Sequence, residues 1–125
     1  MGQTYHLPRK GETLTYNKYR NVKTTIDGIK FDSKAEARRY TELKLLEKAG
    51  EITDLKLQPR FILQHSFKHK GKTIRAITYM ADFQYSENGK EIVEDVKGVE
   101  TAVFKIKKKM FLNIYDGIYE LRIVR

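Results

Sequence analysis

The chain has 125 residues, of which 40% are hydrophobic and 33% charged, so it is long enough for one globular domain with a core and too short for two. It contains no cysteine, which excludes disulfides and thiolate metal sites. No apolar run has the length of a membrane span and no signal-peptide pattern is present, which predicts a cytoplasmic protein with no membrane partner. Twenty-five basic residues against sixteen acidic ones give a net charge of +9, which favours a polyanionic partner, most often nucleic acid.

Residues 1–20 show little hydrophobic periodicity and mix tyrosines with basic side chains. We interpret this segment as a flexible basic arm that DNA could order, followed by a single domain over residues 21–125. The alternative, a disordered terminus with no role, stays open. The basic residues of the arm are Arg9, Lys10, Lys18 and Arg20.

The first predicted helix begins at Ser33, because serine followed three residues later by Glu36 forms a capping box. Tyr40 and Leu43 recur at helical spacing, and Gly50 ends the helix. Glu36 shares the buried face with Tyr40 and Leu43, so two roles are open for it. It either holds the backbone of Ser33 as part of the cap or reaches the sheet as an acidic ligand.

Strands are predicted elsewhere from alternation and turn signals. A hairpin that turns at Asp27-Gly28 comes before the helix. Three strands follow the helix, over residues 55–63, 73–85 and 90–97, and Pro59 interrupts the first of them. Residues 65–72, which are rich in lysine and histidine, are expected to form a loop.

A second helix is predicted over residues 101–115, followed by a short strand over residues 118–124. The residues expected to face inward from this helix are Val103, Ile106, Met110 and Ile114. The order of elements predicts an α/β or α+β fold in which helices flank a central mixed sheet.

Two acidic residues and a lysine fall at the ends of predicted neighbouring strands. Asp95 and Lys97 come thirteen and fifteen residues after Asp82, which lies within an apolar segment. Alternation along a strand points Asp95 and Lys97 to one face and Glu94 to the other. A charged residue in an apolar strand costs free energy unless it is paired or binds a metal. We favour a magnesium site with oxygen ligands, where Lys97 acts on a water or a phosphate, over an ordinary cross-strand salt bridge.

Further polar side chains are candidates for contacts with phosphate groups. Gln58 precedes Pro59, and it either binds a water or phosphate at the site or faces solvent. A basic run in the second helix begins about two turns after Lys97, and contacts from such a run give affinity without sequence information. The predicted nucleic-acid-binding residues are Gln58, Lys105, Lys107, Lys108, Lys109 and Arg20.

Together these residues resemble the PD-(D/E)xK nuclease superfamily. The matching parts are Glu36 on the first helix, Asp82 in the middle strand, Asp95-Val96-Lys97 as the (D/E)xK element, and the basic second helix. A closer resemblance, to small phage-encoded endonuclease-like or resolvase-like proteins of this type, rests on residues 27–36, 58–59, 79–83 and 94–98. One departure is Ala81, which stands where the family's name has proline.

The resemblance implies a restriction-endonuclease-like core in the order helix, three strands, helix and strand. It also implies a phosphodiesterase that uses Mg²⁺, or Mn²⁺ in its place, with Asp82, Asp95 and Glu36 as ligands. Lys97 would orient the attacking water or stabilise charge on the phosphorane. Cleavage of this type leaves 5′-phosphate and 3′-hydroxyl ends.

We therefore expect a metal-dependent DNA endonuclease, phage-encoded by resemblance, that acts in recombination, replication or processing of DNA, including branched DNA. Symmetric cutting of a junction would require a homodimer, which no sequence feature establishes. Two alternatives stay open. The first is a non-catalytic nucleic-acid-binding accessory protein with a degenerate site, which binds DNA in a salt-dependent way without cutting it. The second is an interaction factor whose basic surface meets an acidic protein.

Overall fold

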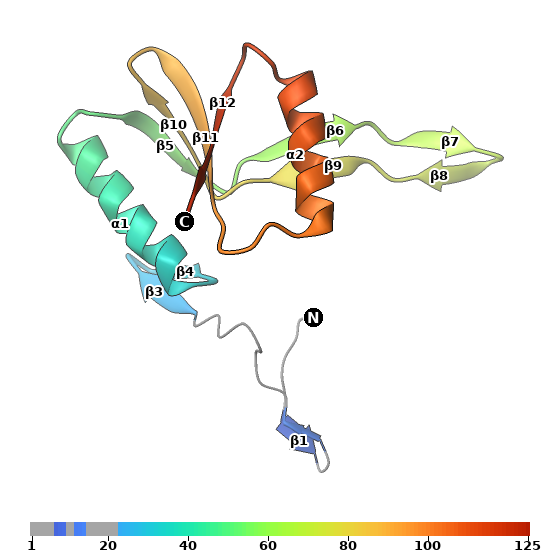
Figure 1. Ribbon diagram of the computed structural model, residues 1–125, viewed down its shortest axis with the longest axis horizontal. Coiled ribbons are helices and arrows are strands. Elements are labelled where there is room, and N and C mark those ends of the chain that lie inside the picture. The colour runs from blue at the N-terminus through green and yellow to red at the C-terminus, as the bar shows by residue number, and fades with distance from the viewer. Residues whose placement is uncertain (1–6, 10–11, 15–22) are drawn as a thin grey trace. The chain divides into compact units, whose positions relative to one another are not determined.

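The structure is a computed structural model that describes the backbone of residues 7–9 and 12–14 and all of residues 23–125 (Figure 1). It is a mixed α+β protein that divides into two compact units, residues 1–38 and 39–125. No helix in the described ranges is long and apolar enough to cross a membrane. In chain order the elements are β1 (Leu7–Arg9), β2 (Glu12–Leu14), β3 (Thr24–Ile26), β4 (Ile29–Phe31), α1 (Lys34–Lys48), β5 (Thr53–Leu57), β6 (Arg60–Gln64), β7 (Phe67–His69), β8 (Lys72–Ile74), β9 (Ile77–Met80), β10 (Phe83–Glu87), β11 (Lys90–Val96), α2 (Ala102–Ile114) and β12 (Glu120–Val124).

The first unit contains two antiparallel strand pairs, β1 with β2 and β3 with β4. Asp27 and Gly28 have φ angles of 53° and 75°, the left-handed conformation of a tight hairpin turn, so the predicted turn is confirmed. The Ser33 hydroxyl accepts a hydrogen bond from the Glu36 N–H at 3.1 Å, which confirms the predicted start of α1. The predicted basic arm over residues 1–20 lies mostly outside the described residues, as does Arg20, and both stay predictions.

The second unit is built on a four-stranded mixed sheet in the order β12-β11-β10-β5. β10 pairs antiparallel with both β5 and β11, whereas β12 lies parallel to β11. Parallel neighbours need a crossover connection, and α2 provides it between β11 and β12. In β11, Ile92, Val93, Glu94 and Asp95 are each at most 1% exposed. This strand therefore holds two carboxylates inside the protein, one on each face of the sheet.

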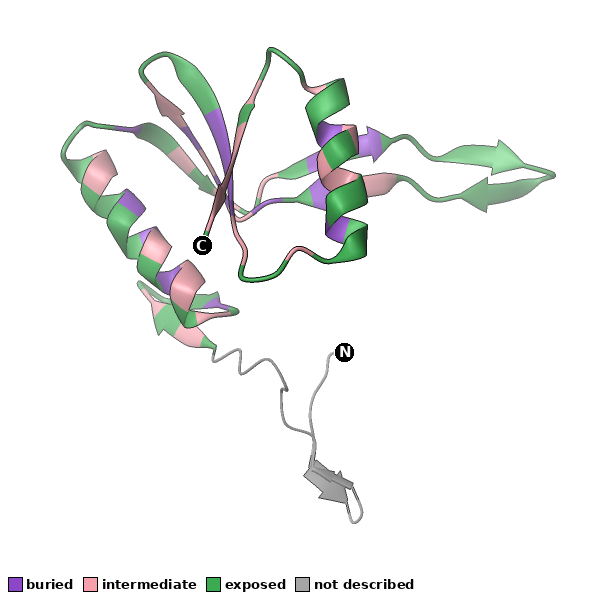
Figure 2. Cartoon of the chain, in the orientation of Figure 1, coloured by how far each residue is buried: buried purple, intermediate pink, exposed green. Residues whose placement is uncertain are grey.

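Residues 53–87 form one long antiparallel ribbon. The pairing shifts by one residue between Gln84 and Ser86, keeps one register from there into β6–β9, shifts by one residue again between Ile62 and Gln64, and continues into β7–β8. The prediction of a loop over residues 65–72 is therefore wrong, because β7 and β8 pair there and turn at Lys70-Gly71. Every residue of these two strands is exposed (Figure 2). The polar composition therefore indicated solvent exposure correctly but did not indicate that the strands pair.

The ribbon bends where Gln58-Pro59 lies opposite Ala81-Asp82. Pro59 has no N–H to donate, and Gln58 adopts a φ of 52°, so regular strand geometry is interrupted there. Two backbone hydrogen bonds still join the strands, from the Gln58 N–H to the Asp82 carbonyl at 2.9 Å and from the Ala81 N–H to the Pro59 carbonyl at 3.0 Å. The predicted interruption at Pro59 is confirmed, whereas the single strand predicted over residues 73–85 is divided among β8, β9 and β10.

The predicted inward stripe of α2 is largely wrong. Val103, Ile106 and Ile114 are 63%, 61% and 42% exposed, whereas Phe104 and Phe111 are buried. The two aromatic residues lie seven positions apart and bury more area than the β-branched residues, so they decide which face turns inward. The core under α2 consists of Phe61, Leu63, Tyr79, Ala81, Val93, Phe104 and Phe111, and Met110 packs against it.

This assignment of the buried face predicts unequal costs of truncation along α2. Phe111→Ala should lower the free energy of unfolding by about 3–5 kcal/mol, because the Phe111 ring packs edge-on against Phe61 with 5.1 Å between centroids. Val103→Ala and Ile106→Ala, at exposed positions, should each change it by less than about 0.5 kcal/mol. Urea denaturation of the three variants measures these free energies of unfolding. Equal losses in all three would support the inward face of α2 that was predicted from the sequence.

Candidate functional site

Asp82 is held in place by three segments of the second unit. Its N–H donates to the Glu94 carbonyl at 3.2 Å, and its own carbonyl accepts from the Gln58 N–H. Its half-buried carboxylate accepts a hydrogen bond from the backbone N–H of Val96 at 2.8 Å. The bend of the ribbon therefore places the Asp82 side chain against the end of β11.

Asp95 is 1% exposed and lies beside Asp82 on the face of β11 that packs against α2. The Tyr79 hydroxyl donates to its Oδ2 at 2.5 Å. These surroundings raise the pKa of the Asp95 carboxyl to about 7. Burial is the largest cause, followed by the hydrogen bond with Asp82, while the hydrogen bond from Tyr79 and the positive charge of Lys97 act in the opposite direction.

Lys97 points to the same face as Asp95, as predicted from strand alternation. Its Nζ lies 3.8 Å from the Asp95 Oδ2 and 4.6 Å from the centroid of the Phe104 ring. The backbone N–H of Lys97 donates to the Val124 carbonyl of β12 at 2.8 Å, which fixes the chain just after β11 ends. The ammonium group therefore sits over an aromatic face and beside the carboxylate pair, where it can contact a bound anion.

Glu94 points to the opposite face of the sheet, which confirms the predicted alternation. It is fully buried, and the Arg39 guanidinium of α1 donates to both of its oxygens, at 2.6 and 3.0 Å. The Tyr85 hydroxyl donates to the same carboxylate at 2.6 Å, and burial together with this carboxylate raises the pKa of Tyr85 to about 12. The Arg39 guanidinium thus compensates the negative charge of Glu94, and the pair joins α1 to the sheet.

Four residues of these networks were not predicted: Arg39, Tyr79, Tyr85 and Phe104. Arg39 lies three residues after Glu36 and next to Tyr40, on the face of the helix already assigned as buried, so helical spacing could have identified it. Tyr79 lies two residues before Ala81 and shares the inward face of the ribbon with it. The sequence contained no signal that Phe104 would lie beneath Lys97, because that contact depends on how α2 packs.

The remaining predicted residues are placed as follows. The side chains of Gln58, Lys105 and Lys109 are exposed, and Lys107 and Lys108 are half-buried. The Lys108 Nζ binds Glu100 at 2.8 Å and lies 5.8 Å from the Phe104 centroid, so part of its charge is already compensated. Glu36 belongs to the first unit, and its part in the acidic cluster stays a prediction.

The carboxylate oxygens that the structure brings together as possible metal ligands are those of Asp82 and Asp95. Within the described residues, no group of three histidine, aspartate or glutamate side chains converges where it could hold a metal ion. Mg²⁺ is commonly bound by only one or two carboxylates, with water and substrate oxygens completing its shell. Two neighbouring carboxylates, one of them buried, are consistent with that mode of binding.

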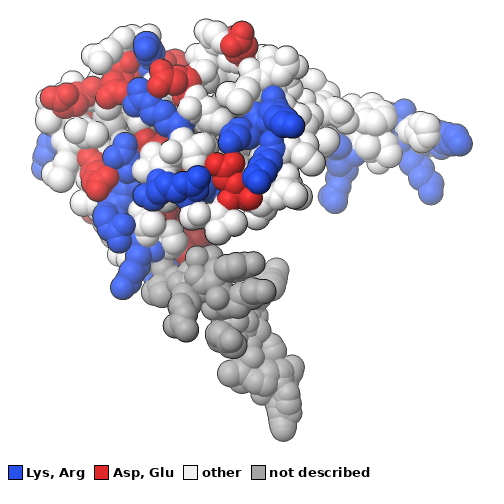
Figure 3. Space-filling model, in the orientation of Figure 1, with Lys and Arg blue, Asp and Glu red and all other residues white. Residues whose placement is uncertain are grey.

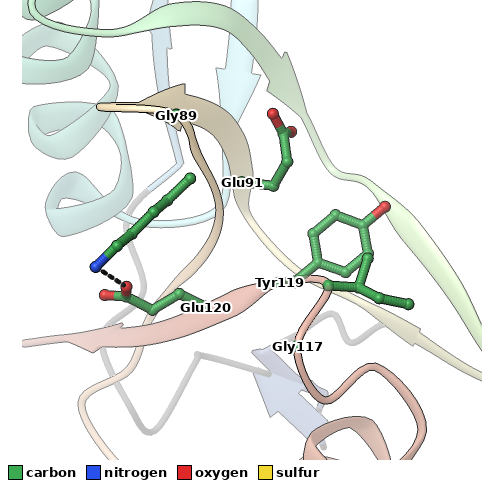
Figure 4. A pocket seen from close by; sticks show the side chains of 7 residues that line it. Gly89, Glu91, Gly117, Tyr119 and Glu120 are labelled. Atoms are coloured by element: carbon green, nitrogen blue, oxygen red, sulfur yellow. Dashed lines mark ion pairs between the residues drawn. The ribbon is translucent and has the colours of Figure 1, made fainter.

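A pocket lies at the other end of the sheet and takes no part in this cluster (Figure 4). It is located between the β10–β11 turn and the start of β12, and the Lys90 Nζ lies 3.7 Å from a Glu120 oxygen there. Lys90 is five residues before Asp95, which corresponds to about 17 Å along an extended strand. The lining residues are Gly89, Lys90, Glu91, Gly117, Ile118, Tyr119 and Glu120.

The raised pKa of Asp95 predicts how stability depends on pH. The unfolded carboxyl has a pKa of about 4, so the folded state binds this proton more tightly than the unfolded state does. The resulting stabilisation is complete below about pH 4 and is lost as the pH rises through about 7. Because one pKa unit corresponds to about 1.4 kcal/mol, the loss should reach roughly 2–4 kcal/mol at pH 8.

Asp95→Asn isolates this contribution, because an amide has no proton to lose in that range. Thermal denaturation in EDTA at pH 5 and pH 8 should show a larger loss of stability for the wild type than for Asp95→Asn. Parallel losses in the two proteins would mean that Asp95 is ionised across the whole range.

No curated protein and no solved structure matches the chain. A family model described as "Protein of unknown function (DUF1064)" matches residues 16–125, a range that includes Asp82, Asp95 and Lys97. Because the match extends over most of the sequence, the chain belongs to this family of proteins of unknown function.

Proposed function

We propose that this protein is a Mg²⁺-dependent DNA endonuclease of the PD-(D/E)xK type, in which Asp82, Asp95 and Lys97 form the catalytic centre. The observation that carries the proposal is the convergence of two carboxylates, Asp82 and the buried Asp95, with the Lys97 ammonium 3.8 Å from Asp95. An exposed salt bridge would need only one acid and would not bury it. A buried carboxyl that is poorly compensated is instead typical of a functional site.

The fold supports the proposal at the level of element order. A restriction-endonuclease-like core requires a helix, three strands, a helix and a strand around a mixed sheet. The order α1, β5–β6, β9–β10, β11, α2 and β12 is compatible with that core when each interrupted strand is counted once. Asp95 comes from β11 and Lys97 follows that strand directly, whereas Asp82 lies in the bend between β9 and β10 and not within the middle strand that the resemblance implies.

Each residue of the proposed site would have its own role. Asp82 and Asp95 would hold the cation, and Glu36 is a further candidate ligand. When bound there, Mg²⁺ would supply Lewis acidity toward the phosphate and lower the pKa of a water. Lys97, positioned over Phe104, would orient the attacking water or bind a phosphate oxygen as negative charge develops. Tyr79 would fix the rotamer of Asp95 through its hydrogen bond.

DNA is the proposed substrate because of the charge of the chain and the distribution of that charge. The net charge of +9 favours a polyanion, and Lys105 and Lys109 are exposed on α2, the helix that covers the Asp95 face. Such side chains contact phosphates and give affinity that falls with increasing salt. A non-catalytic DNA-binding module shares these features, so cleavage is the property that separates the two functions.

Cleavage should depend on Asp82 and Lys97. We expect Asp82→Asn and Lys97→Ala each to lower Mg²⁺-dependent cleavage by about 100-fold or more, because each removes a group that acts on the reacting phosphate or its cation. Labelled single strand, linear duplex, nicked duplex and four-way junction, each with EDTA, Mg²⁺ or Mn²⁺, provide the assay. Binding of the same DNAs in EDTA should be retained in Asp82→Asn.

Lys108→Ala is the matched control for Lys97→Ala. The two lysine side chains are 29% and 30% exposed and both lie near the Phe104 ring, but Lys108 pairs with Glu100 and not with Asp95. Its loss should reduce cleavage by less than about tenfold, through binding alone. Full activity of Asp82→Asn would sink the assignment, and binding without cutting under every condition would identify a non-catalytic module.

The role proposed for Tyr79 predicts an effect on metal affinity. Tyr79→Phe removes the hydrogen bond that orients Asp95 and stabilises its ionised form, so Mn²⁺ should bind about 10–100-fold more weakly. Tyr85→Phe is the matched control, because Tyr85 is also buried and also donates to a β11 carboxylate, on the other face. Mn²⁺ titration by calorimetry should show little change in that control. Equal affinities in the two variants would limit Tyr79 to a structural role.

A further inference from the structure

The β7–β8 hairpin extends out of the second unit without packing against it (Figures 1 and 2). All six residues of its strands are exposed, and Phe67 and Ile74, which face each other across the strands, remain 47% and 39% exposed. A two-stranded ribbon without a sheet or helix against it is only marginally stable. Its length is therefore not explained by any contribution to the core.

All charged residues of the hairpin are also basic. From Leu55 to Ala81 the sequence has no aspartate or glutamate, and Figure 3 shows basic groups on the projecting hairpin without acidic ones. This is the longest stretch of the sequence without an acidic residue, and it is longer than the one that contains the basic run of α2. The cationic residues of the hairpin and its base are Lys68, Lys70, Lys72 and Arg75.

We infer that the β7–β8 hairpin is an arm that enters the major groove of duplex DNA beside the cleavage site. A two-stranded ribbon fits the width of that groove, and lysines on the ribbon can bind the phosphates along its walls. Lys68 and Thr73 form a cross-strand pair on one face, and His69 and Lys72 form one on the other, so both faces carry hydrogen-bond donors toward the walls. The position of the arm relative to cleavage rests on the proposed function, whereas duplex binding by the arm does not.

The ribbon sets the reach of this arm. Asp82 lies eleven positions after Gly71 at the turn, and at about 3.3 Å per residue these eleven steps extend at most about 36 Å. That length is about one turn of B-form DNA. The tip should therefore contact the duplex within about one helical turn of the phosphate that Asp82 and Asp95 act upon.

Lysines on exposed strand edges also prevent edge-to-edge association of proteins, and that role requires no DNA. The salt dependence of binding separates the two roles. Each phosphate contact that is lost lowers the slope of log affinity against log salt by about 0.9. The variant Lys68→Ala/Lys70→Ala/Lys72→Ala should therefore bind a labelled duplex of roughly 30 base pairs about tenfold or more weakly near 0.1 M salt, with a slope smaller by up to about three.

Lys44→Ala/Lys48→Ala/Lys90→Ala is the matched control, because it removes the same charge from three exposed lysines that lie outside the β7–β8 hairpin. Both variants are measured by fluorescence anisotropy in EDTA, so the result does not depend on cleavage, and thermal denaturation checks that both are folded. The control should lose less than about threefold in affinity. Wild-type affinity and slope in the hairpin variant would overturn the proposal, as would equal losses in the two variants.

The absence of cysteine allows a second test in a chain that keeps its other lysines. Lys70→Cys, labelled with a photo-crosslinker, should attach to the duplex, and the same label on Lys48→Cys should not. If the protein cuts, the crosslink should map within about one helical turn of the cut. Crosslinking without cutting would support the arm and reject the nuclease, whereas cutting without a crosslink at Lys70→Cys would support the nuclease and reject the arm.

Discussion

The bend of the long ribbon at Gln58-Pro59 is the constraint on which the candidate site depends. The two hydrogen bonds across the bend keep the strands in register while the geometry of a regular strand is broken. Paired residues end with Phe83 opposite Glu94, and just beyond that point the Asp82 carboxylate accepts the Val96 N–H. The Asp82 side-chain oxygen thus accepts a backbone hydrogen bond that a main-chain carbonyl would accept in a regular strand pair. Without the bend, Asp82 would follow the alternation of its strand and would not be directed to the end of β11.

The two buried carboxylates of β11 show that burial alone does not mark a functional residue. Glu94 receives two hydrogen bonds from the Arg39 guanidinium and one from Tyr85, so its charge is compensated and it holds α1 on the sheet. Asp95 has one hydrogen bond from Tyr79, an ammonium at 3.8 Å and a second acid beside it, which leaves its pKa raised to about 7. The folded protein retains this unfavourable arrangement, and a cation would relieve it. The difference between two adjacent residues is the strongest physical reason to look for function on the Asp95 face.

Much of the local structure could be predicted from the sequence, because turns, helix caps and strand alternation depend on neighbouring residues in the chain. The Asp27-Gly28 turn, the Ser33 cap and the opposite directions of Glu94 and Asp95 are of this kind. The errors arose where packing between distant segments decides. On α2 the stripe of Val103 and Ile106 fits the helical period as well as Phe104 and Phe111 do, and only the tertiary contacts choose between them. In the same way, the composition of residues 65–72 indicates exposure, which a loop and an unpacked hairpin share.

The ribbon gives the two proposals a common mechanical basis. Phe61 and Tyr79 belong to the core under α2 and Ile77 packs against it, so the ribbon is anchored from the bend at Asp82 as far as Ile77. Beyond that point all residues of β7 and β8 are exposed, and no further apolar burial holds the strands together. The free energy that orders the tip must therefore come largely from whatever it contacts. If that partner is duplex DNA, binding at the tip would stiffen the ribbon that leads to Asp82, and substrate contact would be coupled to the site through that ribbon.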